Sequence, residues 1–157
     1  MIFLIVVIGF GFIYLSPTGS GPSFDLPFLP QPSKIKSIDI NGVIIKAEIA
    51  DNKDKRTKGL SDRISLATDS GMLFVYPEPD KYIFWMKGVK FPLDFIWISG
   101  DKIVDIFENV QPPIEGQKDS DLPVYSSPQM VDKVLELNAG VAQKLNLKVG
   151  DIIKLSP

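Results

Sequence analysis

Apolar and polar residues alternate along most of the chain beyond residue 34, with the two-residue period that is typical of β-strands. Asn41-Gly42 separates two of these runs, residues 38–40 and 43–49, and this dipeptide favours the tight type I′ turn of a β-hairpin. Further runs predict strands at residues 71–76, 83–86, 95–99, 103–110, 133–137 and 152–155. The pattern therefore indicates a mostly β domain.

Two short segments break the strand period and are predicted to be helices. In the first, Asp51 can cap the N-terminus, Asp54 falls in the first turn, and Gly59 can end the helix. In the second, Asn138 can cap a helix at residues 139–145. Many short strands with two short helices favour a single jelly-roll-like sandwich or a barrel over a doubly wound sheet.

Two details of the strands are also predicted. Pro77 and Pro79 should end the strand at residues 71–76, because proline lacks the N–H that a sheet requires. In residues 103–110, strict alternation places even-numbered residues on one face of the strand and odd-numbered residues on the other.

The N-terminal part differs sharply from the rest. Residues 1–15 are uncharged and almost wholly apolar, and residues 16–33 are dense in Pro, Gly and Ser. We expect an apolar helix that anchors the protein in the membrane, followed by a linker that leads to the domain at residues 34–157. A cleaved signal segment and a buried helix are the alternatives. The expected location is the outer face of the cytoplasmic membrane, or outside the cell if the segment is cleaved.

Composition excludes several kinds of chemistry. The chain has no Cys and no His, so it cannot form disulfides, thiol nucleophiles, Cys/His zinc sites or Ser-His-Asp triads. Its net charge of −2 arises from interspersed charges of both signs, which argues against nucleic acid as a partner. No metal or cofactor motif is present, so we expect no cofactor. Any catalysis would need carboxylates, Lys, Tyr or Ser.

The most suggestive stretch for function is residues 81–99, where charges lie among aromatic side chains. Asp94 can satisfy backbone N–H groups or pair with Lys87, or it can line a pocket. Lys87 has the same alternatives, and it can also be a solvated loop residue. Trp85 is either a core residue or a platform on which a ligand stacks. This stretch predicts a polar pocket near Trp85, Lys87 and Asp94.

Three further residues are candidates for ligand binding. Glu108 and Glu136 lie in predicted strands, and the face that each occupies decides between a pocket and solvent. Arg56 is either the charged end of a helix or a clamp on Glu136 or Asp94. The full set of predicted ligand-binding residues is Arg56, Trp85, Lys87, Asp94, Glu108 and Glu136.

The order of several short motifs resembles a known family, the uncharacterised domain-of-unknown-function family number one hundred and ninety-two. The motifs are Arg56…Gly59-Leu60, Gly71-Met72-Leu73-Phe74, Phe84-Trp85-Met86-Lys87, Pro92-Leu93-Asp94, Glu108-Asn109-Val110, Val134-Leu135-Glu136-Leu137-Asn138-Ala139-Gly140 and Lys148-Val149-Gly150-Asp151. The resemblance implies a small, jelly-roll-like β fold that often follows a signal or anchor, and it implies no activity. Gly88, Ser61 and Pro113-Ile114 depart from the family pattern, which often has Asn, Met and Cys there.

Three functions are compatible with these observations. The first is a non-catalytic ligand-binding or accessory module, with a small molecule or an envelope component as ligand. The second is a hydrolase of cell-envelope material that uses Asp94 with Glu108 or Glu136. The third is a structural or assembly partner that uses the linker and the long loop of residues 111–129.

Overall fold

The computed structural model describes residues 6–8, 11–13 and 34–156, which belong to two separate units, Met1–Gln31 and Pro32–Pro157. In the first unit, β1 (Val6–Ile8) pairs with β2 (Gly11–Ile13) in an antiparallel ribbon. Most of residues 1–15 and all of the predicted linker at residues 16–33 lie outside the described residues, so the apolar helix and the linker stay predictions. Among the described residues, no helix is long and apolar enough to cross a membrane.

The second unit is built on one sheet of seven strands in the order β11-β3-β4-β5-β10-β7-β8. All neighbouring strands are antiparallel except β4 and β5, which run parallel. The strands are β3 (Ile35–Ile40), β4 (Val43–Ala50), β5 (Ser70–Asp80), β7 (Leu93–Ser99), β8 (Lys102–Val110), β10 (Val131–Asn138) and β11 (Ile153–Leu155).

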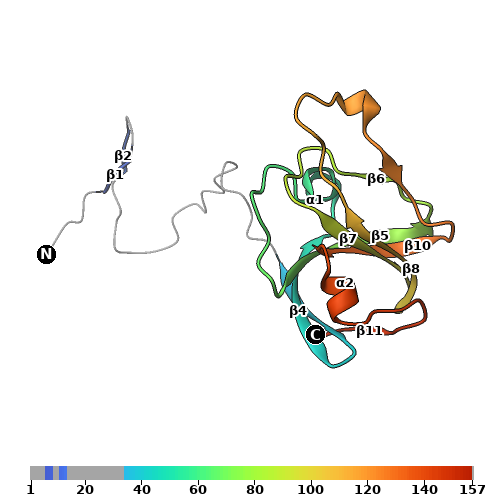
Figure 1. Ribbon diagram of the computed structural model, residues 1–157. Coiled ribbons are helices and arrows are strands. Elements are labelled where there is room, and N and C mark those ends of the chain that lie inside the picture. Colours follow the sequence, from blue (N-terminus) through green and yellow to red (C-terminus); the bar gives the residue numbers. More distant parts are fainter. Residues whose placement is uncertain (1–5, 9–10, 14–33, 157) are drawn as a thin grey trace, which may run out of the picture. The chain divides into compact units, whose positions relative to one another are not determined.

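The sheet curls until its two edges meet at one point (Figure 1). A β-bridge joins Lys102 at the start of β8 to Ile152, which precedes β11. The Ile103 N–H donates to the Asp151 carbonyl oxygen at 2.9 Å, and the Ile153 N–H donates to that of Asp101 at 2.8 Å. The prediction of a mostly β domain with two short helices is confirmed, and the sheet forms a half-barrel rather than two packed layers.

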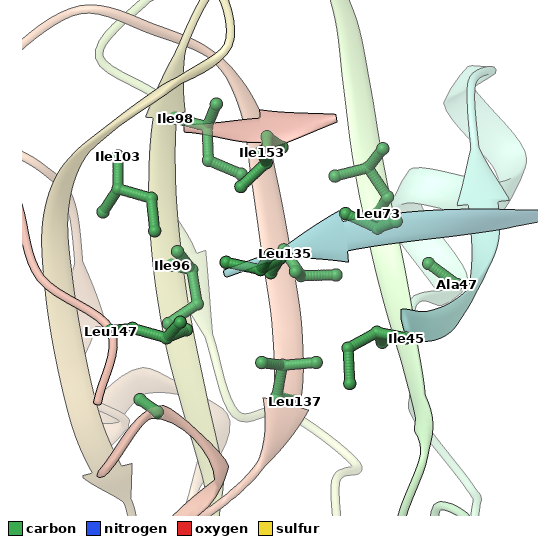
Figure 2. Close-up of a cluster of buried hydrophobic side chains, with 13 residues drawn as sticks. Ile45, Ala47, Leu73, Ile96, Ile98, Ile103, Leu135, Leu137, Leu147 and Ile153 are labelled. Carbon is green, nitrogen blue, oxygen red and sulfur yellow. The ribbon is translucent and has the colours of Figure 1, made fainter. Parts of the chain in front are cut away.

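The inside of the half-barrel is an aliphatic core (Figure 2). Alternate residues of the central strands point into it, among them Leu135 and Leu137 of β10 and Ile96 and Ile98 of β7. The short helix α2 (Val141–Lys144) contacts β7, β8 and β10 and contributes the buried Ala142. This interior contains no aromatic side chain among its buried residues.

The outer face of the central strands carries a second, aromatic core. Trp97 lies at its centre, with Phe84, Phe95 and Phe107 at ring-centroid distances of 5.4, 6.4 and 5.5 Å. This face is covered by helix α1 (Lys53–Lys58), by the segment after it, and by a ribbon of β6 (Phe84–Trp85) and β9 (Val124–Tyr125). The loop before β9 includes the 3-10 helix η1 (Asp119–Asp121).

The turn prediction is confirmed, whereas both predicted helix caps are wrong. Asn41 and Gly42 adopt φ angles of 52° and 82°, as a type I′ turn requires. Helix α1 is capped by Asn52, whose Oδ1 accepts from the Lys55 N–H at 2.9 Å, one residue beyond the predicted Asp51. Asn138 does not cap α2, because it ends β10 and its amide donates to the carbonyl oxygens of Leu66 and Ala67.

The two predicted strand details are also corrected. Strand β5 does not stop at Pro77 but continues to Asp80. The register with β10 shifts between Val131 and Lys133, so β10 pairs with residues on either side of the prolines and needs no N–H from them. Strict alternation fails in β8, where a register shift opposite Trp97 and Ile98 inserts a bulge. As a result, Ile103 and Ile106 both pack against the aliphatic core, despite their opposite parity.

Candidate functional site

A pocket of about 430 Å³ opens on the outer face of the half-barrel, between α1, the end of β5, β6 and the central strand β10. It contains four of the six predicted ligand-binding residues, Arg56, Trp85, Lys87 and Glu136, but not Asp94 or Glu108. The remaining lining residues are Lys53, Thr57, Lys58, Gly59, Leu60, Ser61, Phe74, Tyr76, Ile83, Phe84 and Val89. The predicted polar pocket near Trp85 and Lys87 therefore has a physical counterpart, without Asp94.

Glu136 is the most unusual residue of this pocket. It lies in β10 directly opposite Met72 on one side and Phe95 on the other, so its side chain belongs to the aromatic face. The residue is only 4% exposed, and its carboxyl group makes no hydrogen bond or ion pair within the described part of the chain. Burial raises the pKa of Glu136 to about 8. At neutral pH it is therefore mostly a neutral acid that can donate a hydrogen bond.

Arg56 also lines the pocket, and it contacts Val75 and Tyr76 at the end of β5. Its Nη1 donates to the carbonyl oxygen of Val75 at 2.8 Å, and its Cζ lies 4.9 Å from the centre of the Tyr76 ring. Tyr76 stacks on Tyr82 with ring centroids 3.4 Å apart, and burial raises the pKa of Tyr76 to about 12. Arg56 forms no ion pair with a described carboxylate, so it is not the clamp on Glu136 or Asp94 that was one predicted alternative.

Trp85 and Lys87 lie beside each other on the exposed side of the pocket. Trp85 is 48% exposed, and the Lys87 Nζ lies 5.3 Å from its ring centre. Lys87 also pairs with Asp119 of η1, with an Nζ–Oδ2 distance of 2.6 Å. Lys87 is therefore not the partner of Asp94, and Trp85 is a partly exposed ring rather than a core residue.

Asp94 lies on the other face of the sheet and has a structural role. It is opposite Leu137 in β10, so it points toward the interior of the half-barrel, and it is fully buried. Its Oδ1 accepts from the Asn109 N–H at 2.8 Å, and its Oδ2 accepts from the Ala142 N–H at 2.9 Å. Asp94 thus ties β7 to the end of β8 and to helix α2.

This arrangement does not provide the pair of carboxylates that the hydrolase hypothesis needs. Asp94 and Glu136 project from opposite faces of one sheet, and Glu108 is exposed on β8. Glu136 is the only acidic residue in the lining of the pocket. Within residues 6–8, 11–13 and 34–156, no cluster of three or more acidic side chains is arranged to hold a metal ion.

Sequence reasoning missed Tyr76 and the cationic rim formed by Lys53 and Lys58. Lys53 begins α1 and Lys58 ends it, and only the packing of α1 over the sheet brings both to the pocket. Tyr76 had one available signal, since it is the last residue before Pro77 and ends the apolar part of β5.

Residues 34–156 thus form a curled β half-barrel with a cation-lined pocket on its outer face. The chain belongs to the family DUF192, described as "Uncharacterized ACR", whose model matches residues 36–155. The resemblance drawn from the ordered motifs is therefore confirmed. No curated protein matches the chain.

Two solved structures are similar to this chain at 29% sequence identity. One is a candidate transcription regulator from Sinorhizobium meliloti, with a TM-score of 0.70, and the alignment covers 78% of this chain and 95% of that one. The other is a protein of unknown function from Novosphingobium aromaticivorans, with a TM-score of 0.67 and coverage of 76% and 84%.

The structure gives physical roles to several of the family-like motifs. Pro92-Leu93-Asp94, Glu108-Asn109-Val110 and the end of β10 converge where Asp94 accepts from Asn109 and Ala142, and where the Ala139 N–H donates to the Pro92 carbonyl oxygen at 3.1 Å. Two departures from the family pattern also touch each other. A Cβ added to Gly88 would lie 3.1 Å from the Cβ of Ser61, so a larger residue at one position restricts the other.

Proposed function

We propose that the domain at residues 34–157 is a non-catalytic ligand-binding module, and that its site is the pocket between α1, β6 and β10. The observation that carries this proposal is Glu136, a residue that is 4% exposed, lines the pocket and has a carboxyl group with no partner among the described residues. Burying an unpartnered polar group destabilises a fold by roughly 1 to 3 kcal/mol. A ligand that bonds to Glu136 would compensate this cost.

Binding is favoured over hydrolysis because the pocket lining contains a single acid. A glycosidase mechanism requires two carboxylates with different roles at one site. A contact with DNA, such as the description of the Sinorhizobium meliloti protein would suggest, is not part of the proposal. The net charge of −2 argues against duplex DNA as the partner, because domains that bind DNA usually carry a strong excess of positive charge.

The proposal includes a location, which rests on the sequence alone. The uncharged apolar residues 1–15 would tether the domain to the cytoplasmic membrane, with the domain on the outer face. Cells that express the full chain and a form that begins at Lys34 would be fractionated. The full chain is expected in the membrane fraction and the shortened form in the soluble fraction. Equal distribution of the two forms would contradict the tether.

Binding can be measured with the protein's own tryptophans. The chain has two, and Trp97 is fully buried whereas Trp85 is 48% exposed at the pocket. The full-length protein would be titrated with small anions, neutral saccharides and small amines, with fluorescence and calorimetry recorded in parallel. A ligand of the pocket should change the fluorescence of the wild type. In Trp85→Phe this change should disappear, whereas calorimetry should still detect binding.

Two variants connect any binding to the pocket. Arg56→Ala should weaken binding, because it removes a side chain of the lining. Glu108→Gln is the matched control, since Glu108 is exposed on β8 outside the pocket and should leave affinity unchanged. If no class of compound binds, or if binding is equally insensitive to both variants, the proposed function is wrong.

A further inference from the structure

The charges around the pocket have one sign. Its lining contains four cationic residues, Lys53, Arg56, Lys58 and Lys87, against the single acid Glu136. Of these four, Lys87 alone forms an ion pair with a carboxylate of the described residues. Unpaired positive charge that gathers at a concave site raises the local concentration of anions and repels cations. The charge of the lining therefore selects an anionic ligand.

Arg56 is the cation best prepared to receive an oxyanion. One guanidinium N–H donates to the Val75 carbonyl oxygen, and the guanidinium group lies over the Tyr76 ring. Most of its other N–H donors have no partner among the described residues. A guanidinium that is already oriented matches the geometry of a carboxylate or a phosphate and loses little entropy when it binds one.

Glu136 is compatible with an anion for a separate reason. Burial raises its pKa to about 8, so the group is mostly uncharged at pH 7. An uncharged carboxylic acid does not repel an oxyanion, and its O–H can donate a hydrogen bond to one. The amide of Gln in the same position would also be a donor without charge.

The exposed side of the pocket supplies an apolar surface. Trp85 is 48% exposed and Ile83 is 69% exposed, and both line the pocket. A half-exposed tryptophan beside a cation-lined cavity is suited to stack on a flat ring. A simple inorganic anion would leave this surface unused.

We propose that the pocket binds a small organic anion, in which a carboxylate or phosphate group is held by Arg56 and the surrounding lysines while a flat ring lies against Trp85. This inference rests on the proposed function and specifies the chemistry of the ligand. The oxyanion supplies the charge and the ring supplies the apolar contact, so both parts are needed.

The test uses four probes that separate these contributions. Phenyl phosphate contains both parts, phenol contains the ring without the charge, inorganic phosphate contains the charge without the ring, and benzylamine carries the opposite charge. Calorimetry on the full-length protein at pH 7 and low salt should give phenyl phosphate an affinity at least tenfold above that of each other probe. The affinity should fall as NaCl is added, because ions screen exposed charges.

Variants assign the effect to particular side chains. Arg56→Gln should reduce phenyl phosphate affinity at least tenfold, whereas Lys144→Gln, which removes a cation from α2 outside the pocket, should leave it unchanged. Trp85→Ala should reduce the affinity for phenyl phosphate but not for inorganic phosphate. Glu136→Ala, which removes the O–H donor from the pocket, should reduce the affinity for phenyl phosphate at least threefold.

The possible failures are distinguishable. If phenol or benzylamine binds as tightly as phenyl phosphate and Arg56→Gln has no effect, the anionic ligand is excluded while a ligand-binding pocket stands. If none of the probes and no saccharide binds, the proposed function fails as well. If phenyl phosphate binds equally to the wild type, Arg56→Gln and Trp85→Ala, the binding lies elsewhere and the inference is overturned.

Discussion

Two buried carboxyl groups on neighbouring strands have opposite environments. Asp94 of β7 points into the half-barrel, where both of its oxygens accept backbone N–H groups. Glu136 of β10 points to the outer face, where it has no partner among the described residues. Both groups are buried acids in apolar surroundings, and only the partners differ. Burial alone therefore does not select a candidate functional acid, and the absence of a partner is what sets Glu136 apart from Asp94.

The same contrast extends to the two cores that surround these acids. The interior core is aliphatic and is enclosed by the curled sheet and α2. The outer core is aromatic, contains the indole N–H of Trp97 without a hydrogen-bond partner, and adjoins the pocket. The interior therefore satisfies the carboxyl group of Asp94, whereas the outer face leaves two polar groups without a partner, and of these two only Glu136 lines the pocket.

The largest expected effect is the loss of Asp94. Asp94→Ala would leave the N–H groups of Asn109 and Ala142 buried without acceptors and should destabilise the domain by about 3 to 5 kcal/mol. Urea unfolding followed by circular dichroism measures this change. Glu108→Gln, an exposed change on the adjacent strand, should stay within about 0.5 kcal/mol. Equal stability of Asp94→Ala and wild type would remove the structural half of the comparison.

Glu136 should make stability fall as pH rises. Its folded-state pKa of about 8 lies above the ordinary value of 4.5, so the folded state retains a proton that the unfolded state loses. The contribution of the neutral Glu136 carboxyl group to the free energy of unfolding is fully present below about pH 4.5. It declines by up to about 1.4 kcal/mol per pH unit as the pH rises, and it is lost above about pH 8. Glu136→Gln should remove this decline and be more stable than wild type at pH 9 by roughly 4 kcal/mol.

Unfolding of both proteins at pH 5, 7 and 9 checks the prediction for Glu136. The two should be nearly equally stable at pH 5, because Glu136 is neutral there, and should diverge as the pH increases. Parallel curves for wild type and Glu136→Gln would show that the carboxyl group has an ordinary pKa in the folded state, which would contradict its burial without a partner.

The interior should tolerate less change in volume than the rim of the pocket. In Gly71→Ala the new Cβ would lie 2.9 Å from the Glu136 carbonyl oxygen and 2.9 Å from a Leu137 methyl group, so it should destabilise by about 1 to 3 kcal/mol. Ile83→Ala, on the exposed rim, should cost less than about 0.5 kcal/mol. Thermal melts of both variants compare the two faces directly, and a neutral Gly71→Ala would show that the interior can adjust.

The smallest expected effect concerns Lys87. Its ion pair with Asp119 joins side chains that are 48% and 59% exposed, so Lys87→Ala should change stability by less than about 0.5 kcal/mol. Because Lys87 and Asp94 do not pair, Lys87→Ala and Asp94→Asn should be additive in a double-mutant cycle. A coupling above about 1 kcal/mol would mean that the two charges interact after all.

Local patterns were sufficient to predict several elements from the sequence. The Asn41-Gly42 turn, the two strands that flank it and the mostly β character follow from backbone preferences and from the two-residue period, which act over a few neighbouring residues. Helix caps were less predictable, because Asp51 and Asn52 are both capable and only the final geometry selects Asn52. The bulge in β8 could not be predicted either, because it depends on how β8 pairs with β7 in the folded sheet.

The candidate site shows where sequence reasoning ends. The residue types, an absence of Cys and His, and the charges among aromatic rings restricted the chemistry and drew attention to Arg56, Trp85, Lys87 and Glu136. Only the tertiary structure decided that Glu136 faces the pocket and Asp94 faces the interior. The physical reason is that a sheet sends adjacent positions to opposite faces, so the register between distant strands, which no local pattern specifies, determines which acid meets a partner.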